Sequence, residues 1–442
     1  MPKRIGLTIL LFLFLYSVSA QEKWNYPNVD RKSYELYEQQ KWLELIDYSA
    51  AARKNGIDFF YLQVRTGIAF YNLEKYNKSI PYFRKAWEAD NSQEWLQEYL
   101  YYSLVFAGRS LEASKIARHF SESLKRKIDF QNSQAIYAAV EIGYSFNPDL
   151  DKLKENTFDK DLNIENDYGE AFIFKNYLFE SVDFNHRVIP GFVINHNFTH
   201  LNVNRLQQVD WGQRYTFDTK TNQNQYFFNP YFVLGKKIHL SPSINLTWGN
   251  FNYFSGAISN TGQIFREVDY KFSDYIFSVS AWTYFGNIAP GAEINFANIY
   301  DTGFSQLSGW ITFYPLSNTK LYITPRVYFK NTSESGFDYN TFGISGGFQL
   351  SQLHFYGQYL NGDMKNFVEP GGYVIANFPG RSEQKILASL YFPTGKKYRF
   401  VVRYINQDIF EKYNVYSNGI LNNSLEYKYI KHTLTAGLSW NF

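Results

Sequence analysis

Cysteine is absent from the 442-residue sequence, and neither sign of charge dominates it. Without cysteine the chain has no disulfide bonds, no thiolate metal ligands, no cysteine nucleophile and no lipid-modified N-terminal cysteine. Its 44 basic and 41 acidic residues leave a formal charge of +3, which is too balanced to predict a nucleic-acid partner from bulk electrostatics. After residue 20 no apolar run approaches about 18 residues, so a mature chain in a membrane cannot cross it as a helix.

Aromatic residues are abundant, but they are dispersed among polar ones. Phe, Tyr and Trp make up 20% of the chain, yet its mean hydropathy is −0.38. A hydrophobic share of 45% with 19% charged residues excludes a disordered or fibrous chain and allows a sizeable core. The combination argues against a helical membrane protein.

Residues 1–20 have the pattern of a secretory signal peptide. Lys3-Arg4 precedes an apolar stretch at 5–16, and residues 17–20 place small side chains where signal peptidase requires them. The apolar stretch is shorter than the roughly 20 residues of a membrane-spanning helix. We predict cleavage after Ala20; an uncleaved anchor is the alternative.

Residues 21–130 are predicted to form a short α-solenoid. Their apolar residues recur with helical spacing, and equivalent positions return at Lys41, Lys75 and Arg109, the 34-residue period of tetratricopeptide repeats. The middle repeat matches best, with small and aromatic residues where two paired helices approach: Gly67, Phe70, Tyr76, Ser79, Phe83 and Ala86. The outer repeats match less well, as end repeats do. A plain helical bundle is the alternative.

From about residue 131 to 442 the period changes to two, which is typical of strands with one apolar and one polar face. Alternation alone fits a soluble sandwich as well as a membrane barrel. The pattern predicts about fourteen strands, with twelve as the alternative. They lie near 136–146, 169–181, 187–201, 223–236, 238–250, 271–285, 287–299, 304–315, 319–331, 340–350, 353–361, 383–393, 397–407 and 430–442.

The connections between these strands alternate in length. Short turns alternate with long polar stretches at 147–168, 202–222, 251–270, 332–339, 362–382 and 408–429, except for a short link at 300–303. Outer-membrane barrels have tight periplasmic turns and long external loops, whereas sandwiches have no reason to segregate lengths in this way. We therefore predict a two-part α + β chain: tetratricopeptide-like repeats in the periplasm, followed at 131–442 by an antiparallel transmembrane β-barrel in the bacterial outer membrane.

The last strand carries Leu438, Trp440 and the terminal Phe442 on one face. This resembles the C-terminal signal that the β-barrel assembly machinery reads by pairing with an exposed edge strand. Together with the signal peptide and the repeats, the whole mature chain resembles YaiO-type outer-membrane β-barrel proteins. It is more distantly similar to exopolysaccharide secretion proteins, which join many more periplasmic repeats to an outer-membrane pore. The resemblance implies an outer-membrane protein without a sharply defined role.

Several charged residues fall on the polar face of the predicted strands. A basic side chain that faces lipid at mid-depth costs roughly 2–4 kcal/mol, so these residues are predicted to line the lumen. They are Glu141, Glu293, Arg326, Arg399 and Arg403. Two interpretations stay open: the charges pair and plug the barrel, or they line a polar, tyrosine-rich conduit suited to sugars or an acidic polymer. His196 and His200 share one strand face about 13 Å apart, too far to share a metal, and are predicted near the outer rim.

The sequence contains no nucleophile elbow, zinc-binding helix, phosphate loop or calcium loop, so no catalytic, cofactor or metal residue is predicted. The main hypothesis is a non-enzymatic barrel, surrounded by outer-membrane lipid, that transports or exports a glycan or polar solute while its repeats dock a periplasmic protein. The first alternative is an occluded barrel that anchors the repeats and their partner. The second and less favoured alternative is an outer-membrane lipid hydrolase.

Overall fold

The computed structural model describes residues 24–130, 134–155, 167–260, 262–332, 336–376, 380–394 and 397–442. The predicted signal peptide lies outside these residues. The chain forms two compact units. One runs up to Ala107 and includes Phe120–Leu124, and the other comprises Gly108–His119 with Lys125–Phe442.

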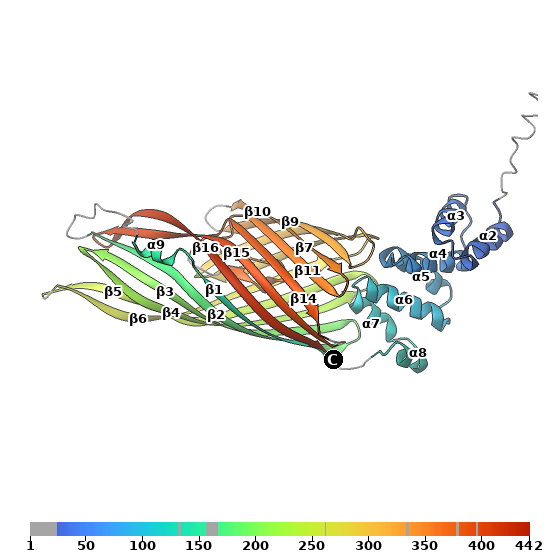
Figure 1. Cartoon of the computed structure of the whole chain (residues 1–442), viewed down its shortest axis with the longest axis horizontal. Helices are drawn as coiled ribbons and strands as arrows, with labels where there is room; N and C mark the ends of the chain where they lie inside the picture. Colours follow the sequence, from blue (N-terminus) through green and yellow to red (C-terminus); the bar gives the residue numbers. More distant parts are fainter. Residues whose placement is uncertain are drawn as a thin grey trace, which may run out of the picture. The chain divides into compact units, whose positions relative to one another are not determined.

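The first unit consists of paired helices. They are α2 (Tyr26–Glu38), α3 (Trp42–Lys54), α4 (Phe60–Asn72), α5 (Tyr76–Ala89) and α6 (Glu94–Phe106), shown in Figure 1. The first described helix begins where Asn25 accepts a hydrogen bond from the Asn28 N–H (3.0 Å), with Pro27 in the first turn. Leu36, Leu45 and Ala69 form one of the small cores between the helices.

The residues predicted to pack the middle repeat lie on α4 and α5. Five of the six are buried and Tyr76 is half-buried. Gly67 faces the ring of Phe83 so closely that a Cβ at this position would lie 2.6 Å from Phe83 Cε1. Only glycine allows this approach of the two helices.

The second unit is a closed barrel of fourteen antiparallel strands, which confirms the predicted fold class and the count of fourteen rather than twelve. Consecutive strands pair, and β1 closes the ring against β16. The strands are β1 (Ala135–Phe146), β2 (Asp167–Ile189), β3 (Phe192–Trp211), β4 (Gln213–Leu234), β5 (Ile238–Ser259), β6 (Gly262–Trp282), β7 (Ile288–Ile299), β8 (Thr302–Phe313), β9 (Leu321–Thr332), β10 (Gly336–Leu350), β11 (Leu353–Gly362), β14 (Gln384–Pro393), β15 (Tyr398–Ser417) and β16 (Ile420–Asn441).

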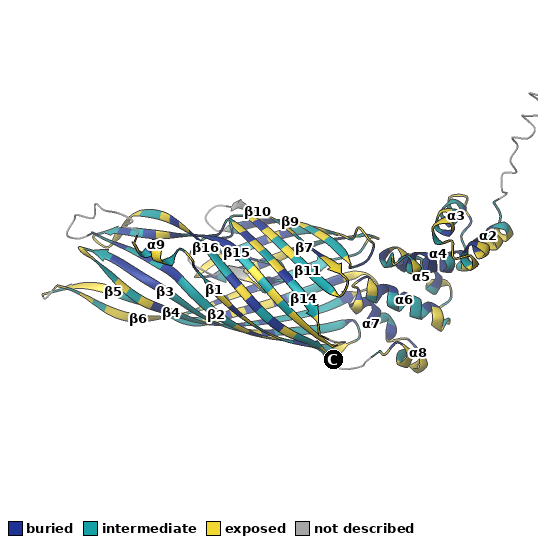
Figure 2. Ribbon diagram, viewed as in Figure 1, coloured by how far each residue is buried: buried dark blue, intermediate teal, exposed yellow. Residues whose placement is uncertain are grey.

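The barrel wall is apolar outside and polar inside. Exposed and less exposed residues alternate along its strands (Figure 2). On β1 the exposed residues are Val140, Ile142 and Tyr144, whereas Ser145 is fully buried. Exposed apolar side chains recur on every strand around the ring, which gives the chain the lipid-facing band of an outer-membrane-type barrel. None of the helices among the described residues is long and apolar enough to span a membrane.

Seven strands are far longer than the roughly 9–11 residues that cross a bilayer. β2 to β6, β15 and β16 have 20 to 23 residues, whereas β7, β8 and β9 have 12. The prediction of long loops at 202–222, 251–270 and 408–429 was therefore wrong, because these stretches extend the strands into hairpins. Charged and amide residues are frequent in these stretches and obscure the apolar alternation in the sequence. The structure nevertheless buries Leu206, Ile409, Tyr413 and Val415 of these stretches in one apolar core while the backbone pairing continues.

Three further helices belong to the connections. α7 (Ser110–Ala117) lies wholly in the barrel unit, α8 (Glu122–Lys127) follows it, and α9 (Leu150–Glu155) follows β1. The connection between β11 and β14 contains a two-stranded sheet, β12 (Phe367–Val368) with β13 (Ile375–Ala376), and a short 3-10 helix, η1 (Pro370–Gly372). This connection is long, as predicted, but it folds into the barrel.

Candidate functional site in the barrel lumen

The charged residues predicted to line the lumen form two ion pairs. Arg403 Nη1 lies 2.7 Å from Glu141 Oε1, and the two side chains meet across β16, which pairs Gly437 with Glu141 and Thr435 with Arg403. Arg326 Nη1 lies 4.0 Å from Glu293 Oε2, and the Arg326 guanidinium stacks 3.9 Å from the centre of the Trp310 ring. The inward charges thus neutralise each other.

Arg399, the fifth predicted residue, has no part in these pairs. It is exposed near the β14–β15 turn, where its carbonyl accepts a hydrogen bond from Ser439 Oγ (3.4 Å). Its place is the mouth of the barrel rather than the interior.

Residues 363–376 and 380–382, here called the inner segment, enter the lumen from the end of β11. The β11–β14 pairing continues into the base of the segment, because the Met364 N–H donates to Ser382 O (2.9 Å). Thr341 on β10 donates to Asp363 O (3.1 Å). The entry to the segment is therefore anchored to the barrel wall.

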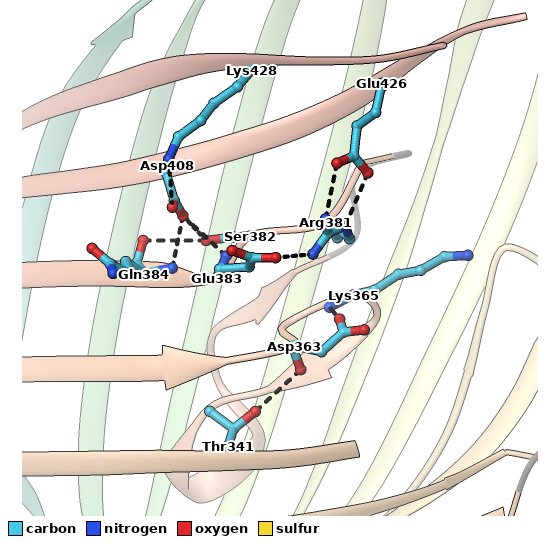
Figure 3. A network of polar contacts seen from close by, with 10 residues as sticks. All are labelled: Thr341, Asp363, Lys365, Arg381, Ser382, Glu383, Gln384, Asp408, Glu426 and Lys428. Carbon is cyan, nitrogen blue, oxygen red and sulfur yellow. Dashed lines mark hydrogen bonds and ion pairs between the residues drawn. The ribbon is translucent and has the colours of Figure 1, made fainter. Parts of the chain in front are cut away.

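A polar network fixes the other end of the inner segment (Figure 3). Asp408 Oδ1 accepts the backbone N–H groups of Glu383 (3.0 Å) and Gln384 (2.7 Å). Arg381 forms a two-pronged ion pair with Glu426, through Nη2 (2.9 Å) and Nε (3.1 Å). The Arg381–Glu426 pair is bidentate but partly exposed, so it orients the exit of the segment against β16 more than it stabilises it.

Between its two anchors the inner segment crosses the lumen. The ring of Phe367 packs against Tyr328 on β9, and the Gln306 amide on β8 bonds both backbone groups of Val368. The Gly371 N–H donates to Glu293 Oε2 (2.8 Å), so this carboxylate joins the segment to the Arg326 pair.

The crossing ends on the opposite wall. Asn245 on β5 donates to Gly372 O (2.8 Å) and Tyr373 O (3.0 Å), and the Tyr373 hydroxyl lies 3.3 Å from both Ser181 on β2 and Thr199 on β3. Gly372 has φ 76°, and a Cβ there would lie 2.4 Å from Ser278 Oγ, so glycine is required. The segment runs from β9 to β2 and narrows the lumen.

A cavity of about 420 Å³ remains between the inner segment and the wall formed by β1–β4 and β14–β16. Its charged lining residues are Glu141, Asp183, Arg205, Glu369, Lys385, Arg403 and Lys431. Arg205 pairs with Glu411 (3.0 Å) and Lys385 pairs with Glu369, whereas the Lys431 ammonium lies over the rings of Phe174 (6.0 Å) and Tyr177 (5.8 Å). The rest of the lining is mixed. Tyrosine rings, amides and hydroxyls lie beside apolar side chains, among them Phe174, Phe179, Leu201, Val203, Val374, Ile405 and Ile409.

One hydroxyl of this lining has no partner among the described residues. Thr435 is 3% exposed, and its Oγ1 makes no hydrogen bond within the part of the chain that the structure describes. A buried hydroxyl usually has a partner, and an ordered water molecule is the partner that we expect for this one. The described residues contain no group of three His, Asp or Glu side chains that could hold a metal ion.

The outer ends of the long strands converge over this lumen. β15 pairs directly with β2, through Asn414 with Glu170, although β16 and β1 separate these strands in the ring. Gln207 on β3 bonds the backbone N–H and carbonyl of Phe254 on β5 (2.6 and 2.8 Å), although β4 lies between them. The extended hairpins thus connect strands that are not neighbours in the barrel.

The remaining sequence predictions have mixed outcomes. His196 and His200 lie in the interior of β3, which continues to Trp211, so their predicted place at the outer rim was wrong. Leu438 and Phe442 are exposed on the last strand, and the Phe442 N–H donates to Ile136 O (3.0 Å). Their role in assembly stays a prediction.

Sequence reasoning missed the residues that hold the inner segment. Gln306, Asn245 and Ser243 are ordinary polar residues of the inward face, and nothing in their spacing distinguishes them from other lumen residues. It also missed the buried contact of His239 with Glu112 of α7. The sequence contained one indication of this contact: His239 lies next to a predicted short turn, and Glu112 lies next to a predicted repeat boundary.

No family model and no curated protein matches the chain. Among solved structures it is similar to a FadL homologue of Pseudomonas aeruginosa, with 10% identity over 74% of this chain and 93% of that chain and a TM-score of 0.42. It is also similar to the toluene transporter TbuX of Ralstonia pickettii, with 7% identity over 71% and 90% of the two chains and a TM-score of 0.42. A bacterial polysaccharide outer membrane secretin matches with 9% identity over 69% and 98%, and a TM-score of 0.33. These similarities concern the barrel fold alone. The chain is an outer-membrane-type β-barrel with an N-terminal helical module.

Proposed function

We propose that this chain transports a hydroxyl-rich solute, a glycan or a fragment of one, through its barrel. The observation that carries the proposal is the cavity of about 420 Å³ beside the inner segment, whose lining combines tyrosines, amides, hydroxyls and ion pairs such as Glu141–Arg403 with apolar side chains. Specific polar ligands are bound by few well-placed hydrogen-bonding groups and aromatic faces in cavities of this size.

The pairing of the inward charges narrows the choice of cargo. Arg403, Arg326 and Arg205 each face a carboxylate. An acidic polymer would have to displace these carboxylates, whereas a neutral glycan can bond to both partners of each pair. The structure therefore favours the neutral glycan over the acidic polymer that the sequence left open.

The proposal includes the placement of the chain in the cell envelope. We place the barrel in the outer membrane, delivered there by the signal peptide and the terminal Phe442, with the helical module in the periplasm. As a tetratricopeptide-like array of a YaiO-type protein, the module would dock a periplasmic protein. Pull-down with the full chain and with a variant altered on the exposed Leu43 and Tyr61 of the module tests this part.

Liposome swelling tests the transport proposal. Asn245→Ala combined with Gln306→Ala removes side chains that hold the inner segment, and we expect this variant to admit neutral oligosaccharides about tenfold faster than the wild type. Asn250→Ala is the matched control, because this amide lies on the same strand but on the opposite face from Asn245. No swelling with either protein, for sugars of any size, would contradict transport.

A second candidate function is an occluded anchor that only holds the helical module at the membrane. The attachment of the inner segment at both ends favours it, since Asp408 and the Arg381–Glu426 pair fix one base of the segment and Thr341 the other. Under this hypothesis the loosened variant would not conduct, while the partner would still bind the full chain.

A further inference from the structure

Helix α7 spans the short-turn end of the barrel, the end formed by the β2–β3, β4–β5, β6–β7, β8–β9, β10–β11 and β14–β15 turns. Ser114 Oγ accepts the Gly191 N–H of the β2–β3 turn (3.0 Å). Lys115 donates to Val233 O (2.8 Å) and Gly235 O (2.7 Å) at the β4–β5 turn. Just before the helix, a Cβ on Gly108 would lie 2.7 Å from Thr319 Cγ2, at the β8–β9 turn.

These contacts lie almost opposite one another on the rim. In the fourteen-strand ring the β2–β3 and β8–β9 turns are six strand positions apart, and seven positions would be a full diameter. A short stretch of chain therefore crosses the middle of the mouth instead of following its edge.

A buried polar network holds the middle of α7 in place. Arg109 and Glu112 form a two-pronged ion pair (2.6 and 2.8 Å), and Glu112 Oε1 lies 2.9 Å from His239 Nε2 at the start of β5. The other nitrogen, His239 Nδ1, lies 2.6 Å from the Tyr231 hydroxyl. The side chains of Arg109, Glu112 and His239 are 5%, 1% and 0% exposed. Arg109 also stacks on the Tyr284 ring (4.6 Å).

A buried polar network of this kind can hold α7 in the mouth of the barrel and still allow the helix to leave it reversibly. Taking charges out of water offsets most of the Coulomb attraction between them, so a buried ion pair contributes little net stability compared with its separated, hydrated state. An apolar helix in the same mouth would instead expose its hydrophobic surface whenever it left. The Arg109–Glu112–His239 network defines one closed position without making it irreversible.

The chain on both sides of α7 belongs to the helical unit, which is the first compact unit and the helical module named above. Residues up to Ala107 and residues Phe120–Leu124 are part of that unit, whereas Gly108–His119 is part of the barrel unit. A movement of the helical unit would therefore pull α7 from both ends.

We propose that α7 is the stopper of the lumen at its short-turn end, and that a protein bound to the helical module opens the barrel by withdrawing it. This inference rests on the proposed transport function. The partner needs only to bind the withdrawn state more tightly than the closed state, since a ligand shifts such an equilibrium by its differential affinity.

Cysteine cross-linking of the full chain tests the stopper, because the native sequence has no cysteine. The Cβ of Lys115 lies 3.0 Å from the position of a Cβ on Gly191, about 0.5 Å short of the Cβ–Cβ range of disulfides, so a small outward shift of the β2–β3 turn allows the bond. In planar bilayers we expect oxidation of Lys115→Cys/Gly191→Cys to lower the open probability about tenfold, and reduction to restore it. The two single-cysteine variants are the controls for the strain of replacing Gly191, which has φ 87°.

Weakening the network should have the opposite effect. Glu112→Ala is expected to raise the open probability about tenfold, and Glu112→Gln less, because an amide can still bond to His239. Glu44→Ala, an exposed glutamate of α3, is the matched control. Gel mobility before and after heating reports whether each variant has folded as a barrel.

Three outcomes are distinguishable. Channels that close on oxidation and open in Glu112→Ala support the stopper. If oxidation and Glu112→Ala change nothing while Asn245→Ala/Gln306→Ala conducts, the stopper is wrong and transport stands. If no variant conducts, the transport proposal fails and the stopper with it.

Discussion

The helical module and the barrel bury opposite kinds of side chain. In the module Leu45, Leu62 and Phe83 are 0% exposed, and none of its described charged residues is buried. In the barrel Ile142 and Val182 are 50% and 54% exposed, whereas Asn295 and Gln306 are 0% exposed. The two regions follow the same rule in different surroundings, because apolar groups leave water for a protein core in the module and for lipid around the barrel. Burial alone therefore does not identify the apolar side of a membrane protein.

The largest effect is expected in the core of the module. Phe83→Ala removes a ring that packs against Gly67 and should lower the free energy of unfolding of the module by about 3–5 kcal/mol. Urea denaturation followed by the helical circular dichroism signal measures it. A loss below about 1 kcal/mol would mean that the two helices do not pack as described.

Replacing an exposed apolar residue with arginine should cost much more stability in the barrel than in the helical module. Ile142→Arg places a cation in the lipid band and should cost roughly 2–4 kcal/mol of barrel stability. Leu43→Arg alters a residue that is 60% exposed on the module and should cost less than about 0.5 kcal/mol. Refolding yields into lipid vesicles across a urea series give both values, and equal costs would contradict the proposed lipid contact.

The lumen charges should tune ion selectivity. In the Asn245→Ala/Gln306→Ala background, Glu141→Gln leaves Arg403 without its carboxylate partner and should shift the anion-to-cation permeability ratio upward by about twofold. Adding Arg403→Gln should return the ratio to its starting value. Reversal potentials in a salt gradient measure the ratio, and an unchanged value would place the pair away from the ion path.

The smallest expected effect is a pH dependence confined to the module. Burial, and then the neighbouring Tyr76 and Tyr99, raise the pKa of Tyr71 to about 12. An unfolded tyrosine ionises near pH 10, so the folded state alone keeps this group neutral between about pH 10 and 12. The stability that Tyr71 contributes is full below about pH 10 and is lost as the pH rises toward 12.

Tyr71→Phe provides the test of this pH dependence. Its module should lose less stability between about pH 10 and 12 than the wild type, as measured by urea midpoints at each pH. The difference in tyrosinate absorbance between the two proteins should titrate near the higher value. Titration of Tyr71 near pH 10 would show that the side chain is solvated.

Sequence reasoning succeeded where one repeating physical constraint acts on many residues. The period of two identified all fourteen strands, because each crossing strand separates lipid from the lumen at every second residue. It failed at 202–222 and 408–429, where charged and amide residues interrupt the apolar pattern, although Leu206, Ile409 and Tyr413 are buried together. The pairing of Glu141 with Arg403 was one of two open possibilities, since the sequence places both residues in the lumen without giving their separation.

The sequence by itself determined the two-part architecture, the inward face of each strand and the helical spacing of the module. All three follow from local periodicity, which reports the solvent on each side of an element. Only the tertiary structure decided that the inner segment turns into the lumen and that α7 crosses the short-turn end of the barrel. These positions depend on contacts such as Gly371 with Glu293 and Glu112 with His239, which join residues distant in the sequence through single hydrogen bonds. A single contact between distant residues produces no repeating pattern in the sequence. It can therefore be identified only in the folded barrel.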